Sequence, residues 1–279
     1  MNCMKSGIAG LSLALLGVLI SEAAYADCTP AHKVQTITPG VLTVSTIVYP
    51  PFDNVDGSGN FVGIDADILK KIAERECLTI KAQAVDDAAS IQYVATGRAD
   101  ISSASWYRTA ARAKVMGVSS PLYLELMGLY SKEGYKKLSD FQGKTVGTVQ
   151  GYLWVSDLQK IFGDNLKLYP NPVAMAQDLD TGRIQTAVDT YNAGIEAQKK
   201  GGFKGFKVVA AEPDDRVASS VHPAQIGLLY TKSNASLGTA LDEDIADMQK
   251  KGEVAAILKN WGLNPDGAKV GAPRYADEK

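Results

Sequence analysis

GRADISSASWYRTAARAKVMGVSSPLY, residues 97–123, predicts a buried strand over 99–102, a turn containing Ser, Trp and Tyr, and one helical turn after Thr109. Thr109 is a suitable helix N-cap, and Arg112 lies three residues further on. Free N–H groups at a helix N-terminus and a neighbouring guanidinium both attract a small anion, because a positive dipole adds to a two-pronged charged donor. The alternative is a surface arginine paired with a nearby acid. The segment is therefore a candidate carboxylate site.

Strands alternate with amphipathic helices on both sides of this segment. A strand after Gly40, a helix from Asp65 and a strand over 78–85 precede it, which predicts βαβ units and a mainly parallel sheet. The pattern then begins again: a glycine-led strand follows, and Thr181-Gly182-Arg183 repeats the earlier Thr96-Gly97-Arg98. Two copies of one α/β unit predict two similar lobes.

Two long apolar strands are predicted over 121–131 and 224–231. Side by side, they would join the two lobes and form a hinge that absorbs ligand-driven closure. This interpretation divides the mature chain into lobe 1, residues 27–124 plus 227–279, and lobe 2, residues 125–226.

Composition and the N-terminus narrow the class of protein. The 279 residues are 46% hydrophobic and carry a formal net charge of −2, with no basic cluster, which argues against a nucleic-acid partner. Lys5, the apolar run 8–20 and Ala24-Tyr25-Ala26 have the form of a cleavable signal peptide over 1–26, so we expect export to the periplasm. The tail after Asn264 is rich in Pro, Gly and charge and is expected to be mobile.

Cysteine and histidine counts agree with export and offer no catalytic constellation. Removal of Cys3 with the signal peptide leaves Cys28 and Cys77, which we expect to form a disulfide in an oxidising compartment. His32 and His222 are the only histidines, and neither has neighbours at metal-ligand spacing. We therefore predict no metal site, no cofactor and no Ser-His-Asp triad.

Short motifs follow one another in an order that resembles a known family, the extracellular solute-binding proteins of polar amino-acid ABC transporters (solute-binding protein family 3). The resemblance runs from about Leu42 to Gly262. It implies a type II periplasmic-binding-protein fold, in which two Rossmann-like α/β lobes joined by two strands enclose a ligand cleft. It also implies a monomer that delivers an amino acid or related small carboxylate to a membrane permease. The motifs are YPPF (49–52), GIDAD (63–67), GRAD (97–100), T-x-x-R (109–112), SPLY (120–123), GKTVG (143–147), GR (182–183), KG (251–252) and WG (261–262).

The resemblance also assigns candidate ligand-binding residues. Those of the first lobe line one wall or hold the ligand carboxylate, and those of the second lobe close over it and hold its amino group. Two further aromatic residues lie near the mouth of the cleft. The candidates are Tyr49, Phe52, Ser103, Ser105, Trp106, Tyr107, Arg112, Gln150, Gly151, Tyr152 and Asp189.

Three departures from the family pattern bear on the ligand. The chain between Ser105 and Thr109 is longer than usual, and Leu153 replaces a hydroxyl residue that binds carboxylate in relatives. The acid for the amino group falls at Thr190 by counting, whereas Asp189 is one residue early and would face the opposite side of a regular strand. A local slip at the end of the strand would return Asp189 to the cleft.

Several residues also have a purely structural interpretation. Trp154 could belong to an aromatic wall, but on a helix it more simply packs between elements. Arg108 could contact an anion, but a solvated or inter-lobe ion pair is the simpler role. Asp65 and Asp67 resemble a catalytic acid pair and are better explained as the cap and first turn of a helix.

Two other functions remain open from the sequence. One is an exported, cofactor-independent enzyme on the same fold, similar to dehydratases of cyclohexadienyl acids, for which Glu125 and Asp189 are the candidate acids. The other is a module that presents a ligand to a separate membrane sensor. The resemblance favours a binding protein over an enzyme.

Overall fold

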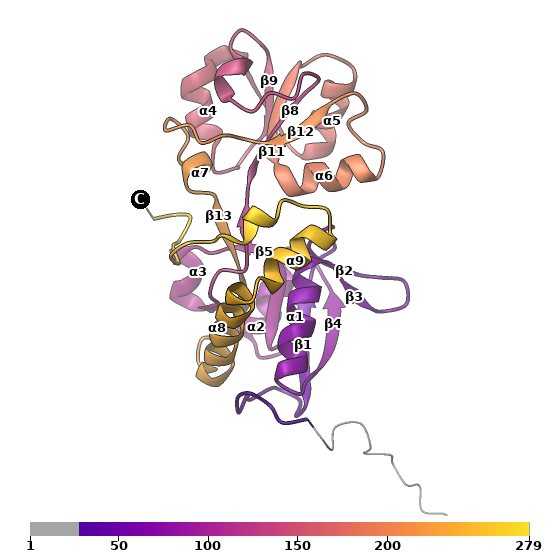
Figure 1. Cartoon of the computed structure of the whole chain (residues 1–279), viewed down its shortest axis with the longest axis vertical. Helices are drawn as coiled ribbons and strands as arrows, with labels where there is room; N and C mark the ends of the chain where they lie inside the picture. The colour runs from indigo at the N-terminus through magenta and orange to yellow at the C-terminus, as the bar shows by residue number, and fades with distance from the viewer. Residues whose placement is uncertain (1–27, 279) are drawn as a thin grey trace, which may run out of the picture.

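The computed structural model describes residues 28–278 and contains two α/β lobes, one above the other in Figure 1. The predicted signal peptide, residues 1–26, lies outside the described residues. Within the described part, no helix is long and apolar enough to cross a membrane.

The first lobe, at the bottom of Figure 1, is built around a sheet with three neighbouring parallel strands. Its elements are β1 (Val41–Thr46), β2 (Asn54–Val55), β3 (Phe61–Val62), α1 (Ile64–Arg75), β4 (Thr79–Ala84), α2 (Asp87–Ala95), β5 (Ile101–Tyr107), α3 (Ala110–Val115), β6 (Gly117–Val118), β7 (Leu124–Glu125), β13 (Ala224–Tyr230), α8 (Ala235–Lys250), α9 (Glu253–Asn260) and η3 (Pro265–Ala268). The sheet order is β4-β1-β5-β13-β6, with β13 antiparallel to β5, and β7 also pairs with β13.

The second lobe repeats this arrangement. Its elements are β8 (Met127–Ser131), η1 (Leu138–Phe141), β9 (Val146–Val149), α4 (Val155–Phe162), η2 (Gly163–Asn165), β10 (Leu166–Tyr169), α5 (Pro172–Asp180), β11 (Thr186–Thr190), α6 (Tyr191–Lys199), β12 (Lys207–Ala210) and α7 (Ala218–Val221). The order β10-β9-β11-β8-β12 again places three parallel strands beside an antiparallel one. The repeat predicted from the sequence is therefore confirmed as a shared strand order.

The predicted apolar face of the first helix forms part of the first lobe's core. Ile64, Ile68, Leu69 and Ile72 of α1 are all buried, at most 2% exposed. Burying each such side chain contributes about 1.5–3 kcal/mol relative to leaving it in water. Helix α1 is thereby fixed against the sheet that carries the candidate carboxylate site.

The strand in the segment 97–123 is longer than predicted. We expected a turn after Ser102, but β5 continues to Tyr107, because β13 pairs with it from Ile101 to Tyr107. The register of this pairing shifts between Gly227 and Leu229, opposite the part of β5 where Ser105 has a φ of 49°. The predicted N-cap is confirmed, since the Thr109 side chain accepts a hydrogen bond from the Arg112 N–H.

The predicted long strand 121–131 is also interrupted. Its first part, β7, pairs with β13 in the first lobe, and its second part, β8, lies in the second sheet. Between them, the carbonyl of Leu126 accepts a hydrogen bond from the N–H of Tyr191, the first residue of α6. Helix α6 was not predicted, and its N-cap residue, Thr190, makes no side-chain capping hydrogen bond.

The expectation of a mobile C-terminal tail is wrong. Gln225 of β13 donates to the carbonyls of Val270 and Ala272, both at 2.8 Å, and Arg108 donates to the carbonyl of Arg274 at 2.7 Å. The buried polar side chains of Gln225 in β13 and of Arg108, just after β5, need hydrogen-bond partners, and the tail supplies them. In Figure 1 the tail crosses the first lobe and ends beside α3.

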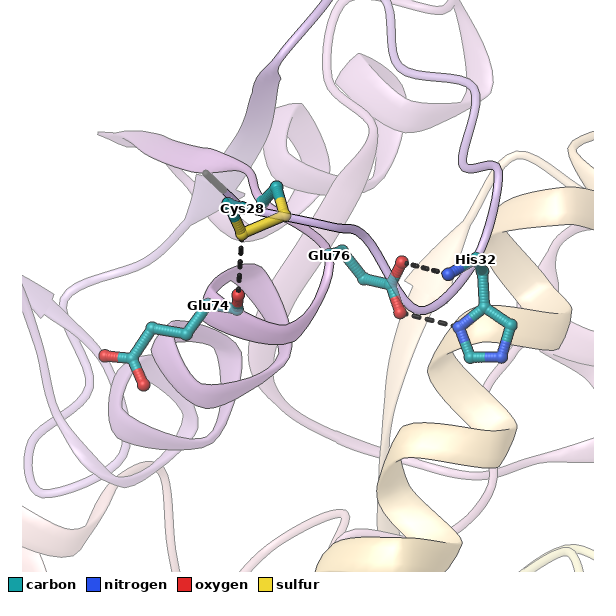
Figure 2. The surroundings of a disulfide bond; sticks show 5 residues. Cys28, His32, Glu74 and Glu76 are labelled. Carbon is teal, nitrogen blue, oxygen red and sulfur yellow. Dashed lines mark hydrogen bonds and ion pairs between the residues drawn. A yellow bond between two sulfur atoms is a disulfide. The ribbon is translucent and has the colours of Figure 1, made fainter. Parts of the chain in front are cut away.

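The predicted disulfide is confirmed: Cys28 and Cys77 are bonded, and their sequence separation is 49 (Figure 2). It ties Cys28, the first described residue, to the chain just after the end of α1. A cross-link that closes a loop of this size restricts the unfolded chain, so the double variant Cys28→Ser, Cys77→Ser should lose about 2–4 kcal/mol of unfolding free energy. Urea unfolding of the oxidised wild type and the variant measures this difference. Coincident unfolding curves would contradict the prediction.

Candidate functional site

Two cavities adjoin each other between the lobes. The arginine cavity, about 730 Å³, is lined from the first lobe by residues that include Ser105 and Arg112, and from the second lobe by 151–154. The aspartate cavity, about 470 Å³, is lined mostly by second-lobe residues, including Asp189. Tyr49 of the first lobe and Tyr152 of the second line both cavities. Volumes of this size are typical of sites for small molecules.

Arg112 is held at the edge of the arginine cavity by short-range contacts. Its Nη1 donates to the Tyr107 carbonyl at 2.6 Å, and its guanidinium lies 4.8 Å from the centre of the Trp106 ring. Burial lowers the pKa of Arg112 somewhat, while the charge of Asp277 raises it. Arginine remains a cation under such shifts. Within residues 28–278, Nη1 is the only guanidinium atom with a hydrogen bond, so the others can bind an anion.

The helix N-terminus beside Arg112 is not available to a ligand, contrary to the sequence expectation. Asp277 of the C-terminal tail accepts from the N–H groups of Ala110 and Ala111, at 2.6 and 3.1 Å, and Thr109 accepts from the next one. The tail carboxylate thus occupies the place that a ligand anion was expected to take. Any anion recognition on this side depends on the Arg112 side chain.

A buried acid network fixes the backbone at Ser105. Asp65 accepts from the Ser105 N–H at 3.0 Å and from the Tyr123 hydroxyl at 2.6 Å. Ser103 is fully buried and donates to Asp53 at 2.8 Å, so it does not line a cavity as predicted. Burial and the neighbouring Asp65 raise the pKa of Asp53 well above its usual range. Ser105 lines the arginine cavity, whereas Ser103 belongs to the buried network with Asp53 and Asp65.

Asp65 of this network and Asp67 are the two acids that resemble a catalytic pair in the sequence. Asp65 lies in the first turn of α1, whose N-cap is Gly63, and its carboxylate points to Ser105 rather than to Asp67. Asp67 accepts a hydrogen bond from the Trp261 indole at 2.9 Å. Both acids therefore lie in the first turn of α1, and the prediction that Asp65 caps the helix is wrong, because Gly63 is the N-cap and no side chain caps it.

Aromatic side chains line the arginine cavity, and hydrogen bonds fix two of them. The Trp106 indole donates to Ser102 at 2.9 Å, and the Trp154 indole donates to Thr148 at 2.8 Å. Trp106 and Tyr107 lie on strand β5 rather than in the predicted turn. Trp154 both packs in the second lobe and lines the cavity, so its two interpretations are compatible.

Three other residues singled out from the sequence lie outside both cavities. Phe52 is fully buried and stacks on Tyr123 with ring centres 6.0 Å apart, so it supports Tyr49 from the core. Gln150 is exposed and lines neither cavity. Arg108 is 6% exposed and points into the first lobe, where it donates to the Ser119 carbonyl and the Gln225 side chain. Arg108 and Arg112 have the same side chain, so the sequence alone could not show that one is buried in the lobe and the other lines the cavity.

Asp189 and Thr190 both line the aspartate cavity. Strand alternation ends here because α6 begins at Tyr191, so neighbouring side chains can face the same space. Asp189 is 4% exposed and accepts from the Thr190 N–H at 2.7 Å. Burial raises the pKa of Asp189 to about 6, while hydrogen bonds from Thr190 and Tyr152 lower it.

Glu125, a candidate acid in the enzyme alternative, lies in β7 at the junction of the lobes. It is 4% exposed, and its carboxylate accepts from the Asn192 side chain at 3.2 Å. Burial raises the pKa of Glu125 to about 8, and the charge of Asp189 adds to this effect. Glu125 lines neither cavity.

Two α/β lobes with charged and aromatic cavities between them define a two-lobed ligand-binding protein. The family model for "Bacterial extracellular solute-binding proteins, family 3" matches residues 42–264, and the chain belongs to that family. It is similar to the L-cystine-binding protein TcyJ of Escherichia coli K12, with 24% identity over 89% of this chain and 94% of the relative. It is also 24% identical to the arginine-binding extracellular protein ArtP of Bacillus subtilis, over 76% of this chain and 82% of the relative.

Solved structures give the same fold. Substrate-binding domain 2 of Lactococcus lactis GlnP, in an open conformation, superposes with a TM-score of 0.66 at 25% identity and covers 81% of this chain and 97% of the domain. The arginine-, lysine-, histidine-binding protein ArtJ of Geobacillus stearothermophilus has a TM-score of 0.59 at 21% identity, over 82% of this chain and 99% of that one. The predicted fold class is thereby confirmed.

Proposed function

We propose that this protein is the exported binding component of an ABC importer, and that it binds an amino acid or a related small carboxylate as its lobes close. The observation that carries the proposal is the placement of two opposite charges. Arg112 lies on the first lobe and Asp189 on the second, in adjoining cavities that share Tyr49 and Tyr152. A zwitterion that contacts both lobes stabilises the closed state, and only such two-lobe contacts can shift the equilibrium toward closure. A closed, loaded binding protein is the form that a membrane permease would receive.

A thermal-shift screen of the mature protein tests this proposal. The panel would contain L-amino acids, including L-cystine, L-arginine and L-glutamine, with small dicarboxylates and quaternary amines. Ligand at a thousand times its dissociation constant stabilises the folded state by about 4 kcal/mol, which is readily measured. For each positive compound, the decarboxylated amine and the N-acetyl derivative are then compared. Loss of the shift with both derivatives supports zwitterion binding, and no shift with any carboxylate would contradict the proposal.

The pH dependence of binding should report Asp189. Because burial raises its pKa to about 6, Asp189 is charged at pH 7.5 and largely protonated at pH 5, where it no longer attracts an ammonium group. Affinity for a zwitterionic ligand should therefore fall below pH 6, by up to about tenfold per pH unit. In Asp189→Asn the affinity should be lower at pH 7.5 and nearly independent of pH in this range. Titration calorimetry measures it, with Asp180→Asn, an exposed acid lining the same cavity, as the control. A wild-type affinity that is constant from pH 5 to 7.5 would contradict the assignment.

The enzyme alternative depends on Glu125 and Asp189 acting as acids. Both have raised pKa values through burial, which is one property of a general acid. Glu125, however, is bonded to Asn192 and lines neither cavity, so only Asp189 faces a possible substrate. Consumption of a cyclohexadienyl acid by the purified protein without added cofactor would establish this alternative.

A further inference from the structure

A second polar cluster lies far from the cavities, beside the disulfide. It joins three residues: His32 of the N-terminal arm (residues 28–40, before β1), Glu76 after α1 and Asp244 of α8. Figure 2 shows His32 and Glu76. One imidazole nitrogen and one carboxylate oxygen from each acid all lie within 4.8 Å of one another. Glu76 and Asp244 are each 4% exposed, and acids buried to this extent are rare unless a cation neutralises them.

The geometry of His32 is that of a positioned ligand. Its Nδ1 lies 2.6 Å from Glu76 Oε1, and its backbone N–H donates to Glu76 Oε2 at 2.9 Å. On the other side of the ring, Nε2 lies 3.0 Å from Glu243 Oε2. A metal-bound histidine usually donates its second N–H to a carboxylate in this way, which fixes the ring and the tautomer.

Asp244 supplies an independent observation. Its Oδ2 atom is buried and has no hydrogen-bond partner among the described residues. The other oxygen, Oδ1, lies 3.6 Å from Arg75. Arg75 is itself engaged by Asp247 and Glu253, both at 3.0 Å. Arg75 therefore does not complete the cluster, and Asp244 Oδ2 is left facing its neighbours without a donor.

The charge balance of the cluster favours a dication. Three carboxylates, those of Glu76, Glu243 and Asp244, surround a single imidazole. A protonated His32 offsets one of these negative charges, and Arg75, which Asp244 shares with Asp247 and Glu253, offsets only part of another. Unpaired buried charge is destabilising. An ion of charge +2 neutralises the two buried acids.

We propose that His32 Nδ1, Glu76 and Asp244 form a site for a divalent transition-metal ion, with Zn²⁺ as the best match. One imidazole and two carboxylates suit Zn²⁺, whereas Ca²⁺ and Mg²⁺ prefer oxygen ligands alone. Ligand atoms of Zn²⁺ lie about 2.0–2.2 Å from the ion, so small side-chain rotations bring the three groups into position. The His32 side chain is 24% exposed, which leaves room for water as a fourth ligand. The bound ion would fasten the N-terminal arm to α1 and α8, next to the disulfide.

Zinc chloride itself is the probe. The mature protein, disulfide intact, untagged and stripped with EDTA, is titrated with Zn²⁺ by calorimetry and by thermal shift. We expect one ion per chain and a raised melting temperature, with no comparable effect of Ca²⁺ or Mg²⁺. Co²⁺ should give the visible absorption of a four-coordinate site. No stoichiometric Zn²⁺ binding, or an equal response to Ca²⁺, would overturn the proposal.

Variants distinguish this site from adventitious binding. Asp244→Asn keeps the shape of the side chain and removes a ligand charge, so it should fold normally and bind Zn²⁺ at least about 100-fold more weakly. Glu243→Gln loses only the acceptor behind the imidazole and should weaken binding about tenfold, as outer partners of metal ligands do. His222→Ala removes the only other histidine and should bind like the wild type. Binding that persists unchanged in Asp244→Asn, or disappears in His222→Ala, would refute the site.

Discussion

Replacement of Arg112 by alanine should weaken binding of the carboxylate ligand by at least about 100-fold, roughly 3 kcal/mol. Truncating one partner of a hydrogen-bonded charge pair in a desolvated site typically has an effect of this size. The loss should be large here because Asp277 and Thr109 already occupy the helix N-terminus, so no backbone donors of α3 can replace the guanidinium. Calorimetry with the compound identified in the ligand screen gives the change in dissociation constant.

Two further variants make the Arg112 result specific. Arg98→Ala removes an exposed cation that stacks on Tyr93, 4.1 Å from the ring centre, and should leave affinity unchanged. Arg112→Lys keeps the charge without the planar fork and should fall between the wild type and alanine. Since the Arg112 side chain makes only one described hydrogen bond within the protein, Arg112→Ala should melt within a few degrees of the wild type. Wild-type affinity in Arg112→Ala would show that the anion binds elsewhere.

Replacement of Glu125 by glutamine should stabilise the protein increasingly as the pH rises from 5 to 8. Burial raises the pKa of Glu125 from its usual 4.5 to about 8. Between these values the unfolded chain has released the proton while the folded protein retains it, so unfolding becomes easier as the pH rises. The slope is at most about 1.4 kcal/mol per pH unit, and above pH 8 it vanishes because both states are ionised.

Glu125→Gln removes the contribution of Glu125 ionisation to the unfolding free energy, but keeps a side-chain oxygen that Asn192 can contact. The advantage of the variant over the wild type should therefore be on the order of 3 kcal/mol larger at pH 8 than at pH 5. Urea unfolding at four pH values measures it, with the exposed Glu133→Gln as the matched control. Asp189 titrates near this range, but it is present in both proteins, so its own contribution largely cancels in the comparison. Parallel stability curves for wild type and variant would contradict a protonated Glu125.

The position of Glu125 links its ionisation to ligand binding at Asp189. It lies on β7, which pairs with β13 where the chain passes between the lobes, and it contacts Asn192 of the second lobe. The charge of Asp189 contributes to its raised pKa. A ligand cation at Asp189 would therefore ease ionisation of Glu125.

The sequence by itself determined the fold class, the repeated α/β unit and the disulfide. Alternating hydrophobic periods identify strands and helices, and the even cysteine pair left after export had one possible partner each. It also determined one local contact. An N-cap side chain accepts a hydrogen bond from the N–H three residues further on, so the sequence places the Thr109 capping bond at Arg112. These features depend on residues close together in the chain or on simple counting.

Tertiary structure decided which candidates reach the site. Ser103 and Ser105 are equivalent in sequence pattern, yet only Ser105 lines a cavity, because Asp53 and Asp65 arrive from another segment and bind them differently. The C-terminal tail supplies Asp277 to α3, and α8 brings Asp244 to His32. Local periodicity reports which side of an element is buried. It carries no information about which distant segment meets that side, and the chemistry of both sites depends on that meeting.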